Sequence, residues 1–239
     1  MENQRFKNQR GLISEADMSR SILIIGAGAI GSYYATTLAK MGFQDITVYD
    51  QDTIEDHNIA NQMYPVPMIG KPKVEALAIV CMQYASVNIK PMRMFWTPEK
   101  ALMADIIVSA VDDMDVRANI WNFYKDKGIQ CFVDGRMGAQ VYRAYSVDMK
   151  DPKEVALYEA SLYPQDEAAP EPCGQKSIIF NVLQVAGAML AMTKQFVRSE
   201  YRPAEVIYDA VNFFMERTYC MEQPIEHIEA PDEEELVEA

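Results

Sequence analysis

The stretch that decides the fold is Ile22-Leu23-Ile24-Ile25-Gly26-Ala27-Gly28-Ala29-Ile30-Gly31. Its first four residues form a continuous apolar run, which is typical of a strand buried on both faces of a sheet. The three glycines have the spacing Gly-x-Gly-x-x-Gly, and the residues from Ile30 to Met41 predict a helix that ends at Gly42. A strand, a glycine-rich turn and a helix in this order predict a site for a phosphate-bearing ligand.

Each glycine of this pattern has its own expected task. Gly26 allows the tight turn, Gly28 lets a ligand approach the backbone closely, and Gly31 allows the helix to pack against the strand. The helix N-terminus then points its N–H groups at an anion. The next strand is predicted over 46–49, and Asp50 follows it, 19 residues after Gly31. An acid at that place accepts hydrogen bonds from ribose hydroxyls, so the pattern predicts an adenine nucleotide, either a dinucleotide or ATP.

The polar residues after Asp50 favour ATP over NAD. They are Asp52, Glu55, Asn58, Asn61, Gln62, Lys71 and Lys73. A lysine ammonium neutralises phosphate charge, an asparagine amide can donate to a phosphate oxygen, and a helix predicted from Lys73 adds its N-terminal dipole. An NAD-dependent oxidoreductase is the alternative that the glycine pattern and Asp50 leave open. Lysines in a first helical turn are also common as solvated residues.

A second acidic group follows the strand predicted over 105–111. Asp112 stands at the carboxyl end of that strand, where the ligands of open α/β sheets bind. A carboxylate there could hold Mg²⁺ against the phosphates. Asp113 and Asp115 are expected instead to cap or charge the start of a helix predicted over 113–127.

The remaining elements indicate an α/β fold. Further strands are predicted over 88–95, 130–134 and 140–148, the last with the alternation of an antiparallel strand. A nearly all-apolar helix over 177–196 is either a central core element or a subunit interface. The segment 206–214 is compatible with a strand or a short helix. We therefore expect a Rossmann-like doubly wound sheet, mostly parallel, with antiparallel additions in the C-terminal half.

The charge distribution divides the chain unevenly. Of 239 residues, 22 are Lys or Arg and 35 are Asp or Glu, which gives a net charge of −13, but eight of the acids follow Arg217 in a tail without Lys or Arg. This balance argues against a general nucleic-acid binder and a polybasic membrane-surface protein. We expect an N-terminal extension (1–20), a nucleotide-binding half (21–150), a crossover loop (151–176), a C-terminal helix and strand half of the same domain (177–221) and an acidic tail (222–239).

The four cysteines and two histidines offer few patterns. No cysteine stands in a Cys-x-x-Cys pair and the chain opens on polar residues, so a cytoplasmic protein with free thiols is expected. Cys81 and Cys131 are expected in the core. Neither His57 nor His227 has the partners of a catalytic triad.

Taken together, these residues resemble the ThiF/MoeB-type adenylyltransferases of the ubiquitin-activating superfamily. The resemblance extends from about residue 5 to about residue 195. The matching pieces are Ile24 to Ser32, Thr47 to Glu55, Asn58-Ile-Ala-Asn61-Gln62, Ile69 to Val74, the Asp112-x4-Arg117 unit, Val133-Asp-Gly135 and Cys173 before the apolar helix.

The resemblance implies a function and a set of roles. Such proteins bind ATP and Mg²⁺ and join the C-terminal carboxylate of a small ubiquitin-like or sulfur-carrier protein to AMP, releasing pyrophosphate. By position, Asp50 would hold the ribose, Asn58 and Lys73 the phosphates, and Asp112 the Mg²⁺ and the reacting groups. Many relatives are homodimers whose sites borrow a residue from the partner. Relatives that adenylate a peptide C-terminus or a nucleic-acid base are an alternative.

The sequence departs from the family pattern at three places. Asn61 and Asn8 stand where the family usually has arginines that face phosphates, and an amide brings no charge. Lys7, Arg10 or Lys71 could supply the missing charge, or the protein could be a catalytically weak nucleotide-binding scaffold. The paired Cys-x-x-Cys motifs of many relatives are absent, so no structural zinc is expected.

Cys173 is the best candidate for a cysteine that accepts the activated acyl group. It precedes the N-terminus of the predicted apolar helix, which lowers a thiol pKa, whereas the neighbouring Glu171 acts in the opposite direction.

Overall fold

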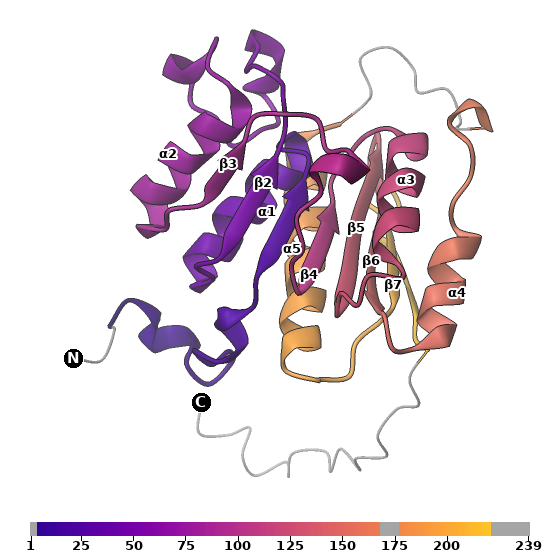
Figure 1. The fold of residues 1–239 in the computed structure, drawn as a ribbon. Coiled ribbons are helices and arrows are strands. Elements are labelled where there is room, and N and C mark those ends of the chain that lie inside the picture. Colours follow the sequence, from indigo (N-terminus) through magenta and orange to yellow (C-terminus); the bar gives the residue numbers. More distant parts are fainter. Residues whose placement is uncertain (1–3, 168–176, 221–239) are drawn as a thin grey trace.

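The computed structural model describes residues 4–167 and 177–220, which form one mixed sheet with helices on both faces (Figure 1). The order of the strands is β3-β2-β1-β4-β5-β6-β7-β8. The strands are β1 (Ile22–Ile25), β2 (Ile46–Tyr49), β3 (Lys90–Met92), β4 (Ile106–Ser109), β5 (Cys131–Gly138), β6 (Val141–Asp148), β7 (Glu205–Asp209) and β8 (Phe214–Thr218). The α-helices are α1 (Ala29–Met41), α2 (Lys73–Ala85), α3 (Met114–Tyr124), α4 (Pro152–Ala160) and α5 (Ile179–Val197). Short 3-10 helices are η1 (Gln4–Gln9), η2 (Asp17–Ser19), η3 (Asp56–Asn58), η4 (Val66–Met68), η5 (Pro98–Lys100) and η6 (Gln165–Glu167).

The first five strands are parallel, as the alternating pattern predicts. Strand β1 pairs with β2 and β4, β2 also pairs with β3, and β4 pairs with β5. Helices α1, α2 and α3 connect successive strands, because a parallel pair needs a crossover rather than a tight turn. All four residues of β1 are buried, which explains their uninterrupted apolar character. The carboxyl ends of these strands meet at one edge of the sheet, which we call the carboxyl edge and which lies at the top of Figure 1.

The last four strands are antiparallel neighbours. Strand β5 pairs with β6, β6 with β7, and β7 with β8. The undecided segment 206–214 proves to be most of β7 and the turn into β8. The Asp209 carboxylate shapes that turn by accepting the N–H of Val211 at 2.8 Å. The predicted fold class, a mostly parallel Rossmann-like sheet with antiparallel additions, is confirmed.

The helices form two layers, each with its own core. Helices α1, α2 and α5 cover one face of the sheet, and α3 and α4 cover the other (Figure 1). Helix α5 is a core element, since Val185 and Met189 are fully buried, but Phe180 (39% exposed) and Leu183 (50% exposed) leave an apolar surface on its first turns. No helix in the described ranges is long and apolar enough to span a membrane.

Several strands differ in length from the sequence prediction, β3 and β5 among them. Strand β3 covers only Lys90–Met92 instead of 88–95, because it lies at the edge of the sheet and Pro91 lacks an N–H for further pairing. Strand β5 continues beyond residue 134 to Gly138, because β6 pairs with it along its whole length.

The N-terminal segment lies far from the glycine loop. Arg5 donates to the Ala85 carbonyl at 2.6 Å, and the Gln9 amide donates to the Met41 carbonyl. Both acceptors are at the C-terminal ends of their helices, whereas the glycine loop begins α1. The 13 residues of α1 span about 20 Å at 1.5 Å per residue, so η1 lies about that far from the loop.

Candidate functional site

The glycine loop between β1 and α1 leaves open space at its centre. Gly26 has φ +102°, and a Cβ there would lie 2.5 Å from the Ala110 carbonyl oxygen. A Cβ at Gly31 would lie 1.9 Å from the Gly26 carbonyl oxygen, so neither position has room for a side chain. A Cβ at Gly28 would meet no atom within 4 Å. Since no side chain caps α1, its first N–H groups are available to an anion approaching Gly28.

Asp50 is held against this loop. Its Oδ2 accepts the N–H of Ala27 at 2.7 Å, and its Oδ1 accepts the N–H of Asp52 at 2.7 Å. These two bonds fix the orientation of the carboxylate. Each carboxylate oxygen has a further lone pair, so Asp50 can still accept hydrogen bonds from sugar hydroxyls.

Lys73 begins α2 next to the same group of residues. Its side chain is 9% exposed, and its Nζ lies 2.8 Å from Asp52 Oδ2. The Lys73 N–H also donates to the Asp52 carbonyl at 2.9 Å, and Thr53 forms a bridge with Pro72. The chain thus places the buried Lys73 ammonium at an uncapped helix N-terminus. Its partner Asp52 is two residues after Asp50, the candidate for ribose binding.

Asn58 is buried in the turn that covers the start of α1. Its Oδ1 accepts the Glu55 N–H at 2.9 Å, which leaves the amide NH₂ as the group that it can offer to a phosphate. The Asn58 carbonyl accepts the Gln62 N–H at 2.9 Å, and the next residue, Met63, donates its N–H to the Ser32 hydroxyl at 3.1 Å. The sequence between Asn58 and Gln62 therefore packs over the first turn of α1.

Asn61 and Gln62 carry orphaned acceptors. The Asn61 amide donates to the Ser177 hydroxyl, just before α5. The side-chain oxygens of Asn61 and Gln62 are buried and have no hydrogen-bond partner in the part of the chain that the structure describes. Because buried acceptors are nearly always paired, these two oxygens fit a donor from a ligand or another chain.

Asp112 lies beside the glycine loop with its side chain exposed. The Ala110 N–H donates to the Ile25 carbonyl at 2.8 Å, and Asp112 follows two residues later in the turn before α3. Its neighbour Asp113 caps α3 by accepting the Val116 N–H at 2.8 Å, as expected for a helix start.

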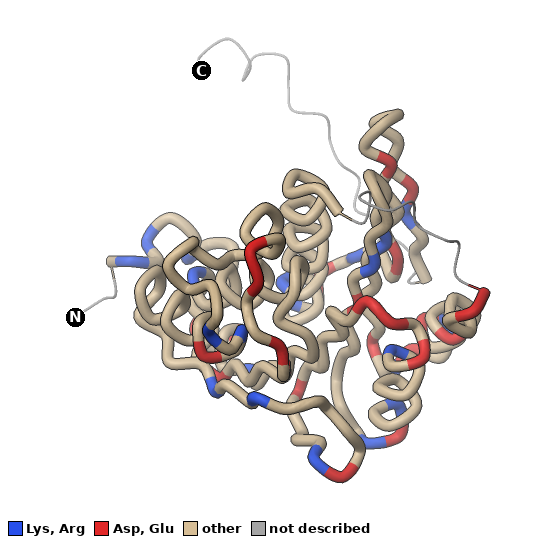
Figure 2. The backbone as a smooth tube through the Cα atoms, turned by 90° about the horizontal axis from the view of Figure 1, so that it is seen from above, with Lys and Arg blue, Asp and Glu red and all other residues tan. Residues whose placement is uncertain are grey.

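The structure thus brings most of the predicted site residues to the carboxyl edge. Figure 2 looks onto this edge and shows acidic and basic segments interspersed rather than a continuous basic patch over the described residues. Cys173 lies outside the described residues, and its predicted role stays a prediction.

Comparison with known proteins identifies the family. The sequence matches the ThiF family over residues 10–222. The chain belongs to the ThiF family. Among relatives of this ThiF-family chain, an adenylyltransferase and sulfurtransferase UBA4 of Yarrowia lipolytica is 29% identical over 113 residues, covering 45% of this chain and 28% of the relative. A NEDD8-activating enzyme E1 catalytic subunit of Arabidopsis thaliana is 40% identical over 72 residues, covering 29% of this chain and 16% of the relative. The matches therefore span less than a third of these relatives' own lengths.

Solved structures share the fold of this ThiF-family chain at low sequence identity. E. coli MccB with MccA-N7isoASN superposes with a TM-score of 0.74 at 13% identity, covering 95% of this chain and 74% of MccB. PaaA superposes with a TM-score of 0.69 at 17% identity, covering 91% of this chain and 69% of PaaA. The resemblance to the ThiF/MoeB type is confirmed.

A buried charge cluster, which the sequence pattern did not reveal, supports the Asp112 turn of this ThiF-family chain. Asp134 is fully buried between Arg117, whose Nε lies 2.8 Å from Oδ1, and Arg136, whose Nε lies 2.7 Å from Oδ2. Arg117 also donates to the Val111 and Gly135 carbonyls, so it ties the end of β4 to β5. The Arg117 side chain is therefore buried and supports the fold, and it does not face the open space of the site.

The ionised form of Asp134 should stabilise the fold strongly. Burial alone would raise the pKa of Asp134, but Arg117 and Arg136 outweigh it and hold the pKa below its ordinary value of 3.8. Ionised Asp134 thus stabilises the protein above about pH 4, and this contribution is lost as the pH falls through the folded-state pKa. We expect Asp134→Asn to lower the free energy of unfolding at pH 7 by about 3 kcal/mol, because it leaves two buried guanidinium groups unpaired.

Urea denaturation between pH 3 and pH 7 tests this expectation. The gap between wild type and Asp134→Asn should narrow at acid pH. Asp45→Asn is the matched control, because the Asp45–Lys90 pair has the same 2.7 Å separation but is 46–65% exposed. It should cost less than about 1 kcal/mol. Equal costs for the two variants, or a gap independent of pH, would contradict the assignment.

Of the basic residues considered for the site, Lys71 is exposed two residues before Lys73, whereas several others are engaged within the fold. Arg117 and Arg136 are engaged by Asp134, and Lys73 is paired with Asp52. Asn8 lies on η1, at the far end of α1, and cannot reach the glycine loop of its own chain. The same distance separates the neighbouring Lys7 from that loop.

Two of the cysteines within the described residues lie in the core, and His57 stands next to Asn58 on η3. Burial raises the pKa of Cys81 to about 11 and that of Cys131 to about 12, as expected for core thiols. His57 is exposed and lies 3.5 Å from Glu55. No group of three or more His, Cys, Asp or Glu side chains in residues 4–167 and 177–220 could hold a metal ion by itself.

Proposed function

We propose that this chain is an ATP-dependent adenylyltransferase that activates the C-terminal carboxylate of a small ubiquitin-like or sulfur-carrier protein. The observation that carries the proposal is the meeting of Asp112, Lys73 and the open glycine loop at one edge of a ThiF-family fold. The relatives named above support it, since they bear the names of adenylyltransferases and of an activating enzyme.

The residues at the carboxyl edge suit each part of ATP. The space at Gly28 and the free N–H groups of α1 would hold a phosphate, and Asp50 would hold the ribose. Lys73 and the Asn58 amide would contact the phosphate chain, and Asp112 would hold Mg²⁺, which neutralises phosphate charge when bound. The incoming carboxylate oxygen forms a bond to the α-phosphorus while the bond to the β-phosphate oxygen breaks, so pyrophosphate leaves.

The position of η1 supports a homodimer. Lys7 and Asn8 cannot serve the site of their own chain, but the η1 segment of a second copy could approach it. The orphaned oxygens of Asn61 and Gln62 fit a donor group from such a segment. The exposed apolar side chains on the first turns of α5 support the same proposal.

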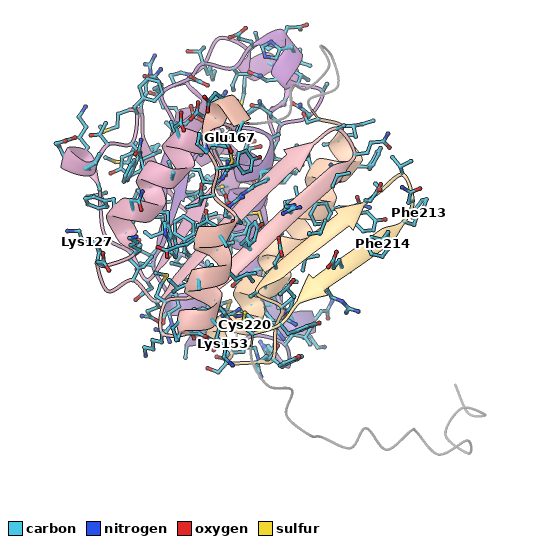
Figure 3. All side chains as sticks on the ribbon, turned by 90° about the vertical axis from the view of Figure 1, so that its right-hand side faces the viewer. Lys127, Lys153, Glu167, Phe213, Phe214 and Cys220 are labelled. Carbon is cyan, nitrogen blue, oxygen red and sulfur yellow. The ribbon has the colours of Figure 1, made fainter. Side chains whose placement is uncertain are left out.

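An exposed apolar surface near the carboxyl edge supports a protein partner. The β7–β8 turn carries Val211 (61% exposed), Phe213 (82%) and Phe214 (58%), and Figure 3 shows both phenylalanines projecting from this turn. The Ala210 N–H donates to the Gln140 carbonyl at 2.9 Å, which ties the β7–β8 turn to the β5–β6 turn. The β5–β6 turn lies at the carboxyl edge, because it follows the carboxyl end of β5. A carrier docked there could extend its C-terminus toward Gly28. A further part of the proposal is attack of the Cys173 thiolate on the acyl carbon of the adenylate, which forms a thioester as the acyl–phosphate bond breaks and AMP leaves.

Exchange of labelled pyrophosphate into ATP tests the function. We expect exchange with Mg²⁺ and a small ubiquitin-like carrier ending in Gly-Gly, and none when the last two glycines of the carrier are removed. ATP binding without exchange for any carrier would favour the nucleotide-binding scaffold, which the asparagines at positions 8 and 61 also suit. NAD binding without ATP binding would refute the proposal.

A further inference from the structure

A chain of polar contacts leads from the buried Asp134 to the turn that carries Asp112. Its first link is Arg136, whose side chain is 11% exposed and whose Nε donates to Asp134 Oδ2 at 2.7 Å. The Arg136 guanidinium lies 4.6 Å from the centre of the Tyr145 ring and 5.3 Å from that of Tyr158. One ion pair and two aromatic rings therefore fix this guanidinium in one orientation.

The second link joins Arg136 to the end of α4. Its Nη1 donates to the Ser161 carbonyl at 2.8 Å, and its Nη2 donates to the Ser161 hydroxyl at 3.0 Å. Ser161 is the C-cap residue of α4. Arg136 thus bridges β5 to the start of the segment 161–167, using three different nitrogen atoms of one rigid fork.

The third link joins that segment to the start of α3. The Met114 N–H donates to the Gln165 side-chain oxygen at 2.8 Å, and the Gln165 N–H donates to Asp115 Oδ1 at 3.1 Å. Figure 3 shows Lys153 near the bottom and Glu167 well above it, so α4 and the segment after it run up toward the carboxyl edge. Met114 and Asp115, shortly after Asp112, are therefore hydrogen-bonded to the segment 161–167.

Two lines of contact thus fix the same turn from opposite sides. Arg117 runs from Asp134 to the Val111 carbonyl, immediately before Asp112. Arg136 runs from the same carboxylate to Ser161, and the backbone from Ser161 to Gln165 continues this line to the Met114 N–H, two residues after Asp112. The exposed Asp112 side chain stands on a short turn whose two ends are anchored to one buried charge.

We propose that Arg136 is a positioning residue, which holds the Asp112 turn in place through Ser161 and Gln165. It touches neither nucleotide nor substrate. Its effect on ATP and Mg²⁺ rests on the proposed function, whereas its effect on the turn does not. Lysine cannot replace it, because a single ammonium on a flexible chain cannot reach Asp134 and both oxygens of Ser161 in one fixed geometry.

Three variants of the full chain test the proposal. Arg136→Lys keeps the charge and removes the fork. Gln165→Ala removes the last link at an exposed residue and leaves the core intact. Arg202→Lys is the matched control, because Arg202 forms an equally buried ion pair with Glu154 at 2.8 Å and also lies over an aromatic ring. That pair contacts the N–H of Asp148, at the opposite end of the sheet.

Hydrogen exchange of the Met114 amide in the protein without nucleotide is the first readout. We expect Arg136→Lys and Gln165→Ala each to raise its exchange rate about tenfold, the order of effect of one lost hydrogen bond to local opening. The double variant should exchange no faster than about the faster single variant, because both changes break one path. Arg202→Lys should change this rate less than about twofold.

The apparent affinity for ATP with Mg²⁺ is the second readout. It should fall about five- to tenfold in Arg136→Lys and in Gln165→Ala, and stay within about twofold of wild type in Arg202→Lys. If wild type binds no ATP, the proposed function is wrong, while faster Met114 exchange in Arg136→Lys still supports the positioning role. Equal Met114 exchange in Arg136→Lys and Arg202→Lys would overturn that role, whatever the ATP result.

Discussion

Replacing Asp112 by alanine is expected to lower carrier-dependent pyrophosphate exchange about a thousandfold and to leave the fold intact. The large effect follows from removing the carboxylate proposed to hold Mg²⁺ against the phosphates, where preorganised charge contributes most to the rate. The fold should survive because the Asp112 side chain is exposed. The exchange rate at saturating carrier and the melting temperature are the two measurements.

The adjacent residue supplies the control for this prediction. Asp113 carries the same charge one position later, but it caps α3 through the Val116 N–H. Asparagine caps helices as well as aspartate does, so Asp113→Asn should leave the melting temperature unchanged. The rate of pyrophosphate exchange should stay within about threefold of wild type. A similar loss in the two variants would mean that general negative charge at this edge matters, and not a metal ligand at position 112.

The parallel half of the sheet could be predicted from sequence because its signals are local. The apolar run before Gly26, the glycine spacing and the position of Asp50 each depend on residues within one strand–helix–strand unit. Asp50 indeed bonds to the N–H of Ala27, and the cost of a side chain at Gly26 and Gly31 is visible in the packing. The strand ends then meet at one edge by topology alone, which brings Asp112 to the same place as Asp50.

The supporting contacts could not be predicted because they join distant residues without a repeated pattern. Arg136 meets Ser161 and Gln165 meets Met114, across gaps of 25 and 51 residues. Arg117 could be recognised as part of the Asp112-x4-Arg117 unit, but not as the partner of Asp134. Nothing in the spacing of Asn8 showed that η1 lies at the far end of α1. Lys7, on the same segment, could therefore serve the site only from a second copy, as the proposed homodimer requires.

Two glycines of one loop should respond in opposite ways to the same added methyl group. We expect Gly31→Ala to lower the free energy of unfolding by about 4 kcal/mol or more and to abolish ATP binding. The added Cβ would lie 1.9 Å from the Gly26 carbonyl oxygen and 3.3 Å from the Ala110 Cβ, so the loop and the end of β4 must both move. Costs of this size are rare for single substitutions and mark a severe steric conflict. Urea denaturation and calorimetric ATP titration measure the two effects.

Gly28→Ala separates ligand space from folding in the same loop. A Cβ at Gly28 meets no protein atom within 4 Å, so the free energy of unfolding should stay within about 0.5 kcal/mol of wild type. ATP affinity should nevertheless fall at least about tenfold, because the methyl group takes the place where a phosphate or sugar approaches the backbone. Wild-type affinity in Gly28→Ala would mean that the nucleotide lies elsewhere, even if Gly31→Ala behaves as expected. Loss of stability in both variants would mean that the loop is closed around Gly28 in solution, and the open space there could then not receive ATP.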